Sequence, residues 1–206
     1  MNKFNIISDE IHVIDKEPIN LHHKVKQRIS NYLGFKADDL LEGTDACYFG
    51  GIVRDSIAEQ DIHDADIMTL PKSANIIVER LISYGFKKTN FASIGITSIY
   101  NNHSVISEPL TFVYYDTIVQ LIRPRFLDIE PEPMEKFNKL LSQVDISACG
   151  VSYSEGKIKE RCKDAIQHCI DREFIVYNDH IFHHKDRIHC RIAKLENRGW
   201  ENITPF

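Results

Sequence analysis

Residues 48–69, YFGGIVRDSIAEQDIHDADIMT, carry the side chains whose types and spacing best suit a chemical role. Asp64 and Asp66 are separated by a single residue in this segment. Alternate side chains of a β-strand point to the same face, so a strand here would direct both carboxylates to one point. Carboxylate oxygens are preferred ligands of Mg²⁺, and two such ions about 4 Å apart can activate a hydroxyl and stabilise a leaving phosphate group. The pair therefore predicts metal-dependent phosphate chemistry.

The residues before that pair suit a bound triphosphate. Gly50-Gly51 lets the backbone turn sharply and approach a ligand, because neither residue has a side chain in the way. Arg54 would lie in the first turn of the next helix, where its guanidinium is a fixed fork of donors for phosphate. Asp55 is placed to hold that guanidinium. We expect a strand before the glycine turn, a short helix after it, and then the strand with the two carboxylates.

Together these residues resemble the signature of the class II head domain of CCA-adding tRNA nucleotidyltransferases and bacterial poly(A) polymerases, GG-x-x-RD-x(8)-D-x-D. The family usually has a glycine at the position of Glu59, and we interpret this difference as variation in a loop. The resemblance is strong over residues 48–69 and looser over the rest of residues 25–200. The matching residues, which need no insertion, are Gly50, Gly51, Arg54, Asp55, Asp64 and Asp66.

The resemblance implies the polymerase-beta-like nucleotidyltransferase fold, which is α/β (α+β), with a mixed sheet of four to six strands flanked by helices and a C-terminal helical segment. It divides the chain into a head domain, residues 1–155, and a helical neck-like appendage, residues 156–206, packed on it. It also implies an Mg²⁺-dependent enzyme, with two ions in the active complex, that transfers an NMP from an NTP to a hydroxyl acceptor, first of all an RNA 3′ end. In this scheme the catalytic metal ligands are Asp64 and Asp66, and the nucleotide-binding residues include Gly50, Gly51, Arg54 and Asp55.

Two further carboxylate positions follow from the same resemblance. The family has an Arg-Asp pair on a later strand that helps to bind the nucleotide, and the comparable segment here, residues 143–147, keeps only Asp145. The family also usually has a third carboxylate on a strand in between, and Gln120 stands at that place. Asp116 could supply the missing carboxylate, since residues 116, 118 and 120 share one face of a regular strand.

The last helix that we expect, residues 186–198, carries a row of cations and is similar to the basic neck helix of the family. Its members are spaced by four, three and four residues, so they share one helix face. Arg198-Gly199-Trp200 then resembles the end of that neck helix. We expect these cations to help fix the nucleotide, and a solvated helix face is an equally good alternative. The cations are Arg187, Arg191, Lys194 and Arg198.

The composition limits the choice of partners. The formal net charge of the 206 residues is −5, which argues against binding of long duplex DNA by bulk electrostatics, so nucleic-acid contacts should be local. No run of about 18 apolar residues is present, so we expect no membrane partner and a soluble, cytoplasmic protein. The five cysteines form no C-x-x-C pair and are expected to be reduced thiols.

The hydrophobic pattern predicts the remaining elements. Helices are expected at 19–33, 73–84, 134–142, 157–169 and 186–198, and strands at 97–100, 110–115, 117–122 and 144–153. Residues 123–133 are expected to be an irregular connection.

Other functions remain open from the sequence. A non-catalytic nucleotide-sensing or interaction module would explain Gln120 and the missing arginines before Asp145. A transferase of this fold could instead act on a protein or small-molecule hydroxyl. A phosphohydrolase is less well supported, because no His-Asp metal pair occurs at helical spacing. The histidines His180, His183 and His184 could bind a transition metal, and an exposed polar turn explains them better.

Overall fold

The computed structural model describes residues 19–89, 109–124, 137–138, 141, 144–177 and 185–205, together with the side chains of all but 19 and 185–187. Its helices are α1 (Ile19–Leu33), α2 (Ala37–Leu41), α3 (Gly51–Ile57), α4 (Pro71–Ser83), α6 (Ala165–Asp171), α8 (Lys185–Glu196) and the 3₁₀ turn η2 (Ser147–Cys149). Its strands are β1 (Cys47–Phe49), β2 (Ala65–Met68), β3 (Lys87–Thr89), β4 (Leu110–Tyr114), β5 (Thr117–Ile122), β6 (Val151–Ser154), β7 (Lys157–Glu160), β8 (Glu173–Phe174) and β9 (Glu201–Asn202).

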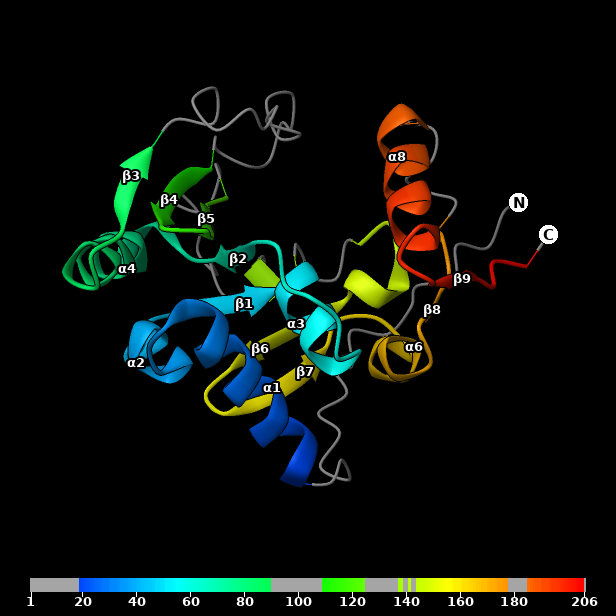
Figure 1. Cartoon of the computed structure of the whole chain (residues 1–206), viewed down its shortest axis with the longest axis horizontal. Coiled ribbons are helices and arrows are strands. Elements are labelled where there is room, and N and C mark those ends of the chain that lie inside the picture. The colour runs from blue at the N-terminus through cyan, green and yellow to red at the C-terminus, as the bar shows by residue number, and fades with distance from the viewer. Residues whose placement is uncertain are drawn as a thin grey trace, which may run out of the picture.

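Over the described residues, the main sheet has seven strands in the order β3-β4-β5-β2-β1-β6-β7. The β2–β5 pair is parallel and the other pairs are antiparallel, so the expected mixed sheet flanked by helices is confirmed. The expected number of four to six strands is wrong, since both edge strands were missed. Figure 1 shows α8 and the small β8–β9 sheet at the opposite end of the molecule from α4 and β3.

The helix expected at 157–169 is wrong for its first half. Glu155 and Gly156 have φ values of 52° and 74°, and a two-residue loop with positive φ at both positions matches the twist of a β-hairpin. Residues 157–160 therefore form β7 against β6, and the helix begins only at Ala165. The domain boundary expected after residue 155 falls inside this hairpin.

The strand expected at 144–153 is interrupted by η2. Ser147 is bound to Ile175 instead of to a neighbouring strand of the main sheet: its N–H donates to the Ile175 carbonyl and its Oγ accepts from the Ile175 N–H, both at 2.9 Å. Gly150 then passes so close to Cys162 that a Cβ would lie 2.3 Å from the Cys162 Sγ. Only after this close approach does β6 begin, at Val151.

The other expected elements agree more closely. The helix at 19–33, the hairpin of β4 and β5, and a C-terminal helix close to 186–198 are confirmed, and α4 begins two residues before the expected 73. The strand expected at 97–100 lies outside the described residues. Of the helix expected at 134–142, only 137, 138 and 141 are described, and they are helical.

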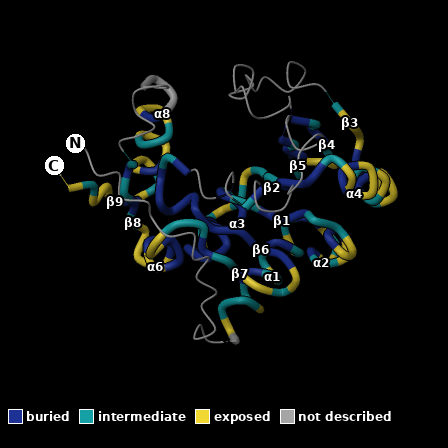
Figure 2. Tube along the Cα trace, turned by 180° about the vertical axis from the view of Figure 1, so that it is seen from behind, coloured by how far each residue is buried: buried dark blue, intermediate teal, exposed yellow. Residues whose placement is uncertain are grey.

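The two faces of the sheet are packed differently. The main core joins the face carrying Tyr48 and Ile67 to the helices, including Val25 and Ile29 of α1. Figure 2 shows the central strands β1, β2 and β6 largely buried, whereas the outer turns of α4 and α8 are exposed. A smaller cluster covers part of the opposite face and consists of Cys47, Met68, Leu70, Ile122, Phe137 and Leu141. Within the described ranges, no helix is both long enough and apolar enough to cross a bilayer.

Candidate metal and nucleotide site

The glycine pair forms the turn between β1 and α3. Gly50 has a φ of +63°, in the region that favours glycine, and its N–H donates to the Val151 carbonyl at 3.0 Å. A Cβ on Gly51 would lie 3.7 Å from Arg54 Nη2 and 3.9 Å from Asp64 Oδ1. Because Gly51 has no such atom, a small space remains open between a guanidinium and a carboxylate.

The two aspartates lie at the start of β2, as expected. Asp64 directly precedes the strand, and Asp66 is its second residue, on the face opposite the main core. Asp66 Oδ1 is buried and has no hydrogen-bond partner among the described residues. Burial and then the nearby Asp64 raise the pKa of Asp66 from 3.8 to about 8, although the charges of Arg191, Lys194 and Arg54 act to lower it. A cation bound here would offset the electrostatic cost of ionising Asp66.

The donor set fits Mg²⁺, which prefers oxygen ligands and is often held by one or two carboxylates plus substrate phosphates. The unpartnered Asp66 oxygen and the nearby Asp64 supply the carboxylates. No group of three or more His, Cys, Asp or Glu side chains that could hold a metal occurs among the described residues. Gln120 pairs with Asp66 in the β2–β5 register, so a neutral amide stands beside the carboxylate pair.

Asp116 does not join this pair. It lies in the exposed turn between β4 and β5, outside both strands and four positions before Gln120 in the chain. Four strand positions correspond to about 13 Å along β5. The structure thus places Gln120, and not Asp116, next to Asp66.

Arg54, Asp55 and Arg198 form a buried ion cluster, here named the clasp. Arg54 donates to both carboxylate oxygens of Asp55, at 2.7 Å from Nε and 3.0 Å from Nη2. Arg198 donates to the same carboxylate from Nη1 at 3.0 Å and to the Asp61 carbonyl from Nη2 at 2.9 Å. The clasp ties the end of the chain to α3, and it holds the Arg54 guanidinium beside the open space at Gly51.

Two residues that are not among the predicted site residues, Trp200 and Gln60, contact the clasp. The Trp200 ring centroid lies 5.5 Å from the Arg54 guanidinium carbon, and the Trp200 Nε1–H donates to Gln60 Oε1 at 2.7 Å. Gln60 Nε2 in turn donates to the Arg198 carbonyl at 2.8 Å. The Arg-Gly-Trp segment gave a signal for Trp200, whereas nothing in the sequence marked Gln60.

Asp145 and Arg191 are brought together, although Asp145 does not lie on a strand. Arg191 Nη1 donates to both Asp145 oxygens, at 2.6 Å to Oδ2. Arg191 Nη2 donates to Cys149 Sγ at 3.1 Å, and Arg54 Nη1 donates to the same sulfur at 3.4 Å. Cys149, for which only a reduced thiol was expected, therefore links the guanidiniums of α3 and α8.

The other cations of α8 are only partly defined. Lys194 is exposed, and its charge acts on Asp66. Arg187 lies on α8, but its side chain is outside the described residues, as are His180, His183 and His184. Two of the four expected cations, Arg191 and Arg198, are bound to carboxylates of the protein itself.

Glu59 occupies the turn after α3 with a φ of 57°. This is the left-handed region, which glycine adopts without steric cost and which explains why a glycine suits the position. Glu59 also forms an ion pair with Lys24 of α1. A glutamate in place of glycine thus strains the backbone of this turn, and it removes no functional group from the site.

Comparison with known proteins supports the fold. No family model matches the chain, and no curated protein is similar to it in sequence. Solved structures with a similar fold include a CCA-adding enzyme in complex with CTP, with a TM-score of 0.61 and 11% identity, covering 89% of this chain and 42% of the enzyme. A tRNA-processing enzyme with CTP has a TM-score of 0.53 and 14% identity, covering 86% and 42%.

A tRNA nucleotidyltransferase complexed with a primer tRNA and an incoming ATP analogue is also similar, with a TM-score of 0.51 and 14% identity, covering 86% of this chain and 46% of that one. At these identities the likeness concerns the fold. The chain spans less than half the length of these three proteins. It thus has a nucleotidyltransferase-like fold, matched to a part of longer tRNA nucleotidyltransferases.

Proposed function

We propose that the protein is an Mg²⁺-dependent nucleotidyltransferase that transfers an NMP from an NTP to a hydroxyl acceptor. The observation that carries this proposal is the buried Oδ1 of Asp66, which has no hydrogen-bond partner within the described part of the chain and lies near the Asp64 carboxylate. The Gly51 backbone and the Arg54 guanidinium border the same place. This set of groups would hold a cation together with a triphosphate.

Some of these residues would hold the metal, and others would hold the nucleotide. Asp64 and Asp66 would hold Mg²⁺, which when bound lowers the pKa of the acceptor hydroxyl and neutralises charge on the leaving pyrophosphate. The absent Cβ of Gly51 leaves room for phosphate oxygens beside Arg54. Asp55 and Arg198 keep the Arg54 guanidinium in place, so the clasp holds this cation in a fixed position away from solvent. Lys194 adds positive potential near Asp66.

An RNA 3′ end is the acceptor that we propose. The similar solved structures are described as tRNA-processing and CCA-adding enzymes, which supports RNA ahead of a protein or small-molecule hydroxyl. The net charge of −5 restricts the acceptor to local contacts. We therefore expect a short end of RNA, rather than a long duplex, to be bound.

The proposal is tested by incubating the purified protein with Mg²⁺ and each labelled NTP, in the presence of total RNA and, separately, of an RNA-free extract. Asp64→Ala and Asp66→Asn should lower label transfer by about a hundredfold or more, since both remove a metal ligand. Asp61→Asn is the matched control, because the Asp61 side chain is exposed. Transfer that persists in both aspartate variants contradicts the proposal.

A second candidate is a nucleotide-sensing module without efficient catalysis. Gln120 favours it, because this neutral residue stands opposite Asp66, where the family usually has a third carboxylate. Such a module would bind NTP with Mg²⁺, as measured by calorimetry, and transfer no label to any acceptor. Gln120→Glu would then be expected to create or increase transfer.

A further inference from the structure

Tyr32 of α1 is joined to the backbone next to the carboxylate pair through its hydroxyl. The hydroxyl donates to the His63 carbonyl at 2.9 Å and accepts from the Ile118 N–H at 3.1 Å. The Ile118 carbonyl is a more distant second acceptor, at 3.3 Å. Asp64 directly follows His63 in the chain. A side chain of the first helix thus reaches the start of β2 at the residue before a proposed metal ligand.

The hydroxyl occupies the place of a hydrogen bond between two strands. Strands β2 and β5 are parallel, and at the far end of the pair the Thr69 N–H donates to the Ile122 carbonyl at 3.1 Å. In a parallel pair alternate residues of one strand form these bonds, so the odd-numbered residues of β2 face β5. Counting back along the register, the first bond of the pair would run from the Ile118 N–H to the His63 carbonyl. These are the two groups that the Tyr32 hydroxyl bridges.

The bridge keeps the two strands apart just before Asp64. Two hydrogen bonds, of 2.9 and 3.1 Å, stand where a single N–H···O bond of about 2.9 Å would otherwise join the strands. The pairing of β2 with β5 accordingly begins at Ala65 and Val119. Tyr32 therefore supports the backbone at the point where the strand pairing ends.

This contact bears on the direction of the Asp64 side chain. The His63 carbonyl and the Asp64 nitrogen belong to the same planar peptide group, so fixing the carbonyl also fixes the plane from which Asp64 projects. Asp64 Oδ1 points towards the glycine turn, where it lies 3.9 Å from the position of a Cβ on Gly51. The orientation of this carboxylate thus depends on a hydrogen bond made by its neighbour in the chain.

Two further features keep the Tyr32 hydroxyl in place as a donor. Thr117 Oγ1 donates to the Tyr32 carbonyl at 3.2 Å, which ties the end of α1 to β5. Burial raises the pKa of Tyr32 to about 12, and the nearby Asp64 and Asp66 also act to raise it. The phenol is therefore uncharged at neutral pH and retains the proton that it donates.

We infer that Tyr32 is a positioning residue for the metal site: its hydroxyl sets the direction of the Asp64 carboxylate by holding the start of β2 away from β5. The inference rests on the proposed function, which assigns Asp64 to Mg²⁺. This ion demands near-ideal octahedral geometry, so a displaced carboxylate binds it less well. Without the hydroxyl, the Ile118 N–H and the His63 carbonyl can bond directly, which draws the start of β2 towards β5 and moves Asp64.

The test is Tyr32→Phe, which removes the hydroxyl and keeps the ring. The probe is Mn²⁺, which suits carboxylate ligands as Mg²⁺ does, and its binding is followed by the electron paramagnetic resonance signal of the free ion. We expect Tyr32→Phe to weaken Mn²⁺ binding by on the order of tenfold, as other changes behind a metal ligand do. In an Asp64→Ala background, Tyr32→Phe should have no further effect on Mn²⁺ affinity, because it acts through Asp64.

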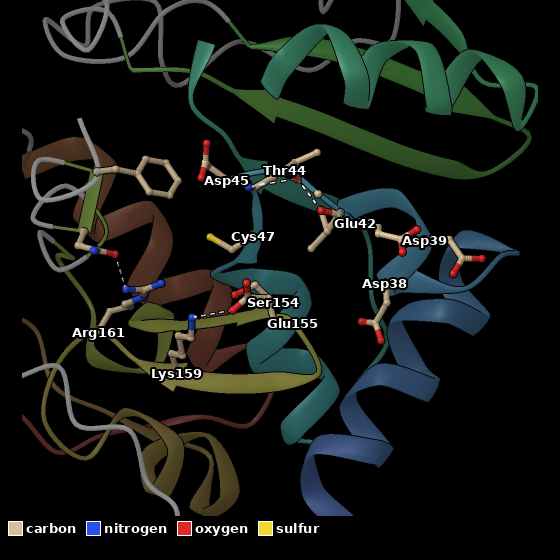
Figure 3. A pocket seen from close by; sticks show the side chains of 15 residues that line it. Asp38, Asp39, Glu42, Thr44, Asp45, Cys47, Ser154, Glu155, Lys159 and Arg161 are labelled. Atoms are coloured by element: carbon tan, nitrogen blue, oxygen red, sulfur yellow. Dashed lines mark hydrogen bonds and ion pairs between the residues drawn. The ribbon is translucent and has the colours of Figure 1, made fainter. Parts of the chain in front are cut away.

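Tyr153→Phe is the matched control, because it also removes one tyrosine hydrogen bond. The Tyr153 hydroxyl donates to the Asp38 carboxylate at 2.9 Å. Figure 3 shows Asp38 among the side chains that line a cavity, and neither Asp64 nor Asp66 is one of them. Tyr153→Phe should therefore bind Mn²⁺ as the wild type does, whatever its melting temperature.

A purely structural role of Tyr32 gives a different result. A lower melting temperature of Tyr32→Phe with the Mn²⁺ affinity of the wild type overturns the inference. An equal loss of Mn²⁺ affinity in Tyr153→Phe also overturns it, because general destabilisation would then explain both. If Tyr32→Phe does not fold, Thr117→Val replaces it, since it removes the bond to the Tyr32 carbonyl, and a loss of Mn²⁺ affinity of about threefold is expected.

Label transfer distinguishes this inference from the proposed function. If the wild type transfers label, Tyr32→Phe should need on the order of tenfold more Mg²⁺ for half-maximal transfer and keep its KM for NTP at saturating Mg²⁺. An unchanged Mg²⁺ requirement overturns the inference while the proposed function stands. If no label is transferred but Mn²⁺ binding depends on Tyr32, the proposed function fails and the inference stands. A wild type that binds no Mn²⁺ overturns both.

Discussion

Burying the ionised Asp66 carboxylate does not in itself stabilise the fold. Its buried Oδ1 has no donor among the described residues, and its ionised form is opposed by burial and by Asp64. Natural chains keep such groups where a ligand compensates for them. The metal that we propose would give this carboxylate, together with Asp64, the positive charge that the surrounding side chains supply only in part.

The raised pKa of Asp66 predicts a dependence of stability on pH. The carboxyl has its ordinary pKa of 3.8 in the unfolded chain and about 8 in the fold. Between these values the unfolded chain releases its proton first, so the free energy of unfolding falls as pH rises, by at most about 1.4 kcal/mol per pH unit from this group. Urea denaturation from pH 5 to pH 8 should show the fall in the wild type and a smaller one in Asp66→Asn.

Magnesium supplies the control for this prediction. Adding Mg²⁺ should restore wild-type stability most strongly at the high end of the range, where Asp66 is ionised, and should have little effect on Asp66→Asn. Parallel pH curves for the two proteins without metal would show that Asp66 does not have the raised pKa.

Glu59 predicts a second effect at the residue scale, through its backbone. Glu59→Gly and Glu59→Ala both remove the ion pair with Lys24, and they differ in how readily they adopt the φ of 57°. Glycine has no steric cost at this φ, so Glu59→Gly should melt roughly 2–4 °C above Glu59→Ala. Calorimetric melting of the two variants checks this, and equal melting temperatures would show that the turn is unstrained.

Among the elements, α3 and the segment after α8 depend on each other through the clasp. Asp55→Asn leaves two largely buried guanidiniums without their carboxylate and should lower the free energy of unfolding by about 3–5 kcal/mol. Arg198→Gln leaves the Arg54–Asp55 pair intact and should cost less, about 1–3 kcal/mol. Chemical denaturation measures both.

A double variant and a surface control sharpen this prediction. Asp55→Asn with Arg198→Gln should be less destabilised than the sum of the two single variants, because the two side chains are in contact. Glu201→Gln, at an exposed position nearby, should leave stability unchanged. Strict additivity would contradict a direct interaction between the two residues.

Elements with a strong local signal were predicted, and those that depend on distant contacts were not. Helix α1 and the β4–β5 hairpin follow from their own periodicity and turn residues. Strand β7, KIKE, has too few apolar residues to show alternation, and its state is decided by the positive-φ turn before it and by pairing with β6. The bend at η2 depends on Cys162 and Ile175, which are far along the chain.

The site, like the fold, combines residues that are close together in sequence with residues from distant segments. Its two aspartates and glycine turn lie close together in sequence and were placed as expected. Asp55, the next residue, holds the Arg54 guanidinium as expected. Its other neighbours come from elsewhere: Cys149 and Trp200 approach it from the far part of the chain, and no local pattern specifies those contacts.

On the scale of the whole molecule, the domain boundary expected after residue 155 divides one hairpin and one hydrophobic core. Strand β7 pairs along the full length of β6, and Ile158, Ile166 and Phe174 are buried in the main core. A fragment of residues 1–155 should therefore show no cooperative thermal transition by circular dichroism, because it exposes this core. Mixing it with a fragment of residues 156–206 should restore a transition at least in part. Cooperative melting of the first fragment alone would contradict the prediction.

The clasp also sets an order of events during biosynthesis. Asp55 and its partner Arg198 are separated by 143 residues, and Gln60 and Trp200 by 140. Contacts at such separations form late, after local hairpins and helices. During synthesis on the ribosome, Arg198 and Trp200 emerge long after Arg54 and Asp55. The guanidinium beside Gly51 thus acquires its final support only once residues 198–200 are available, so a nascent chain can carry both aspartates and the glycine turn before the clasp is complete.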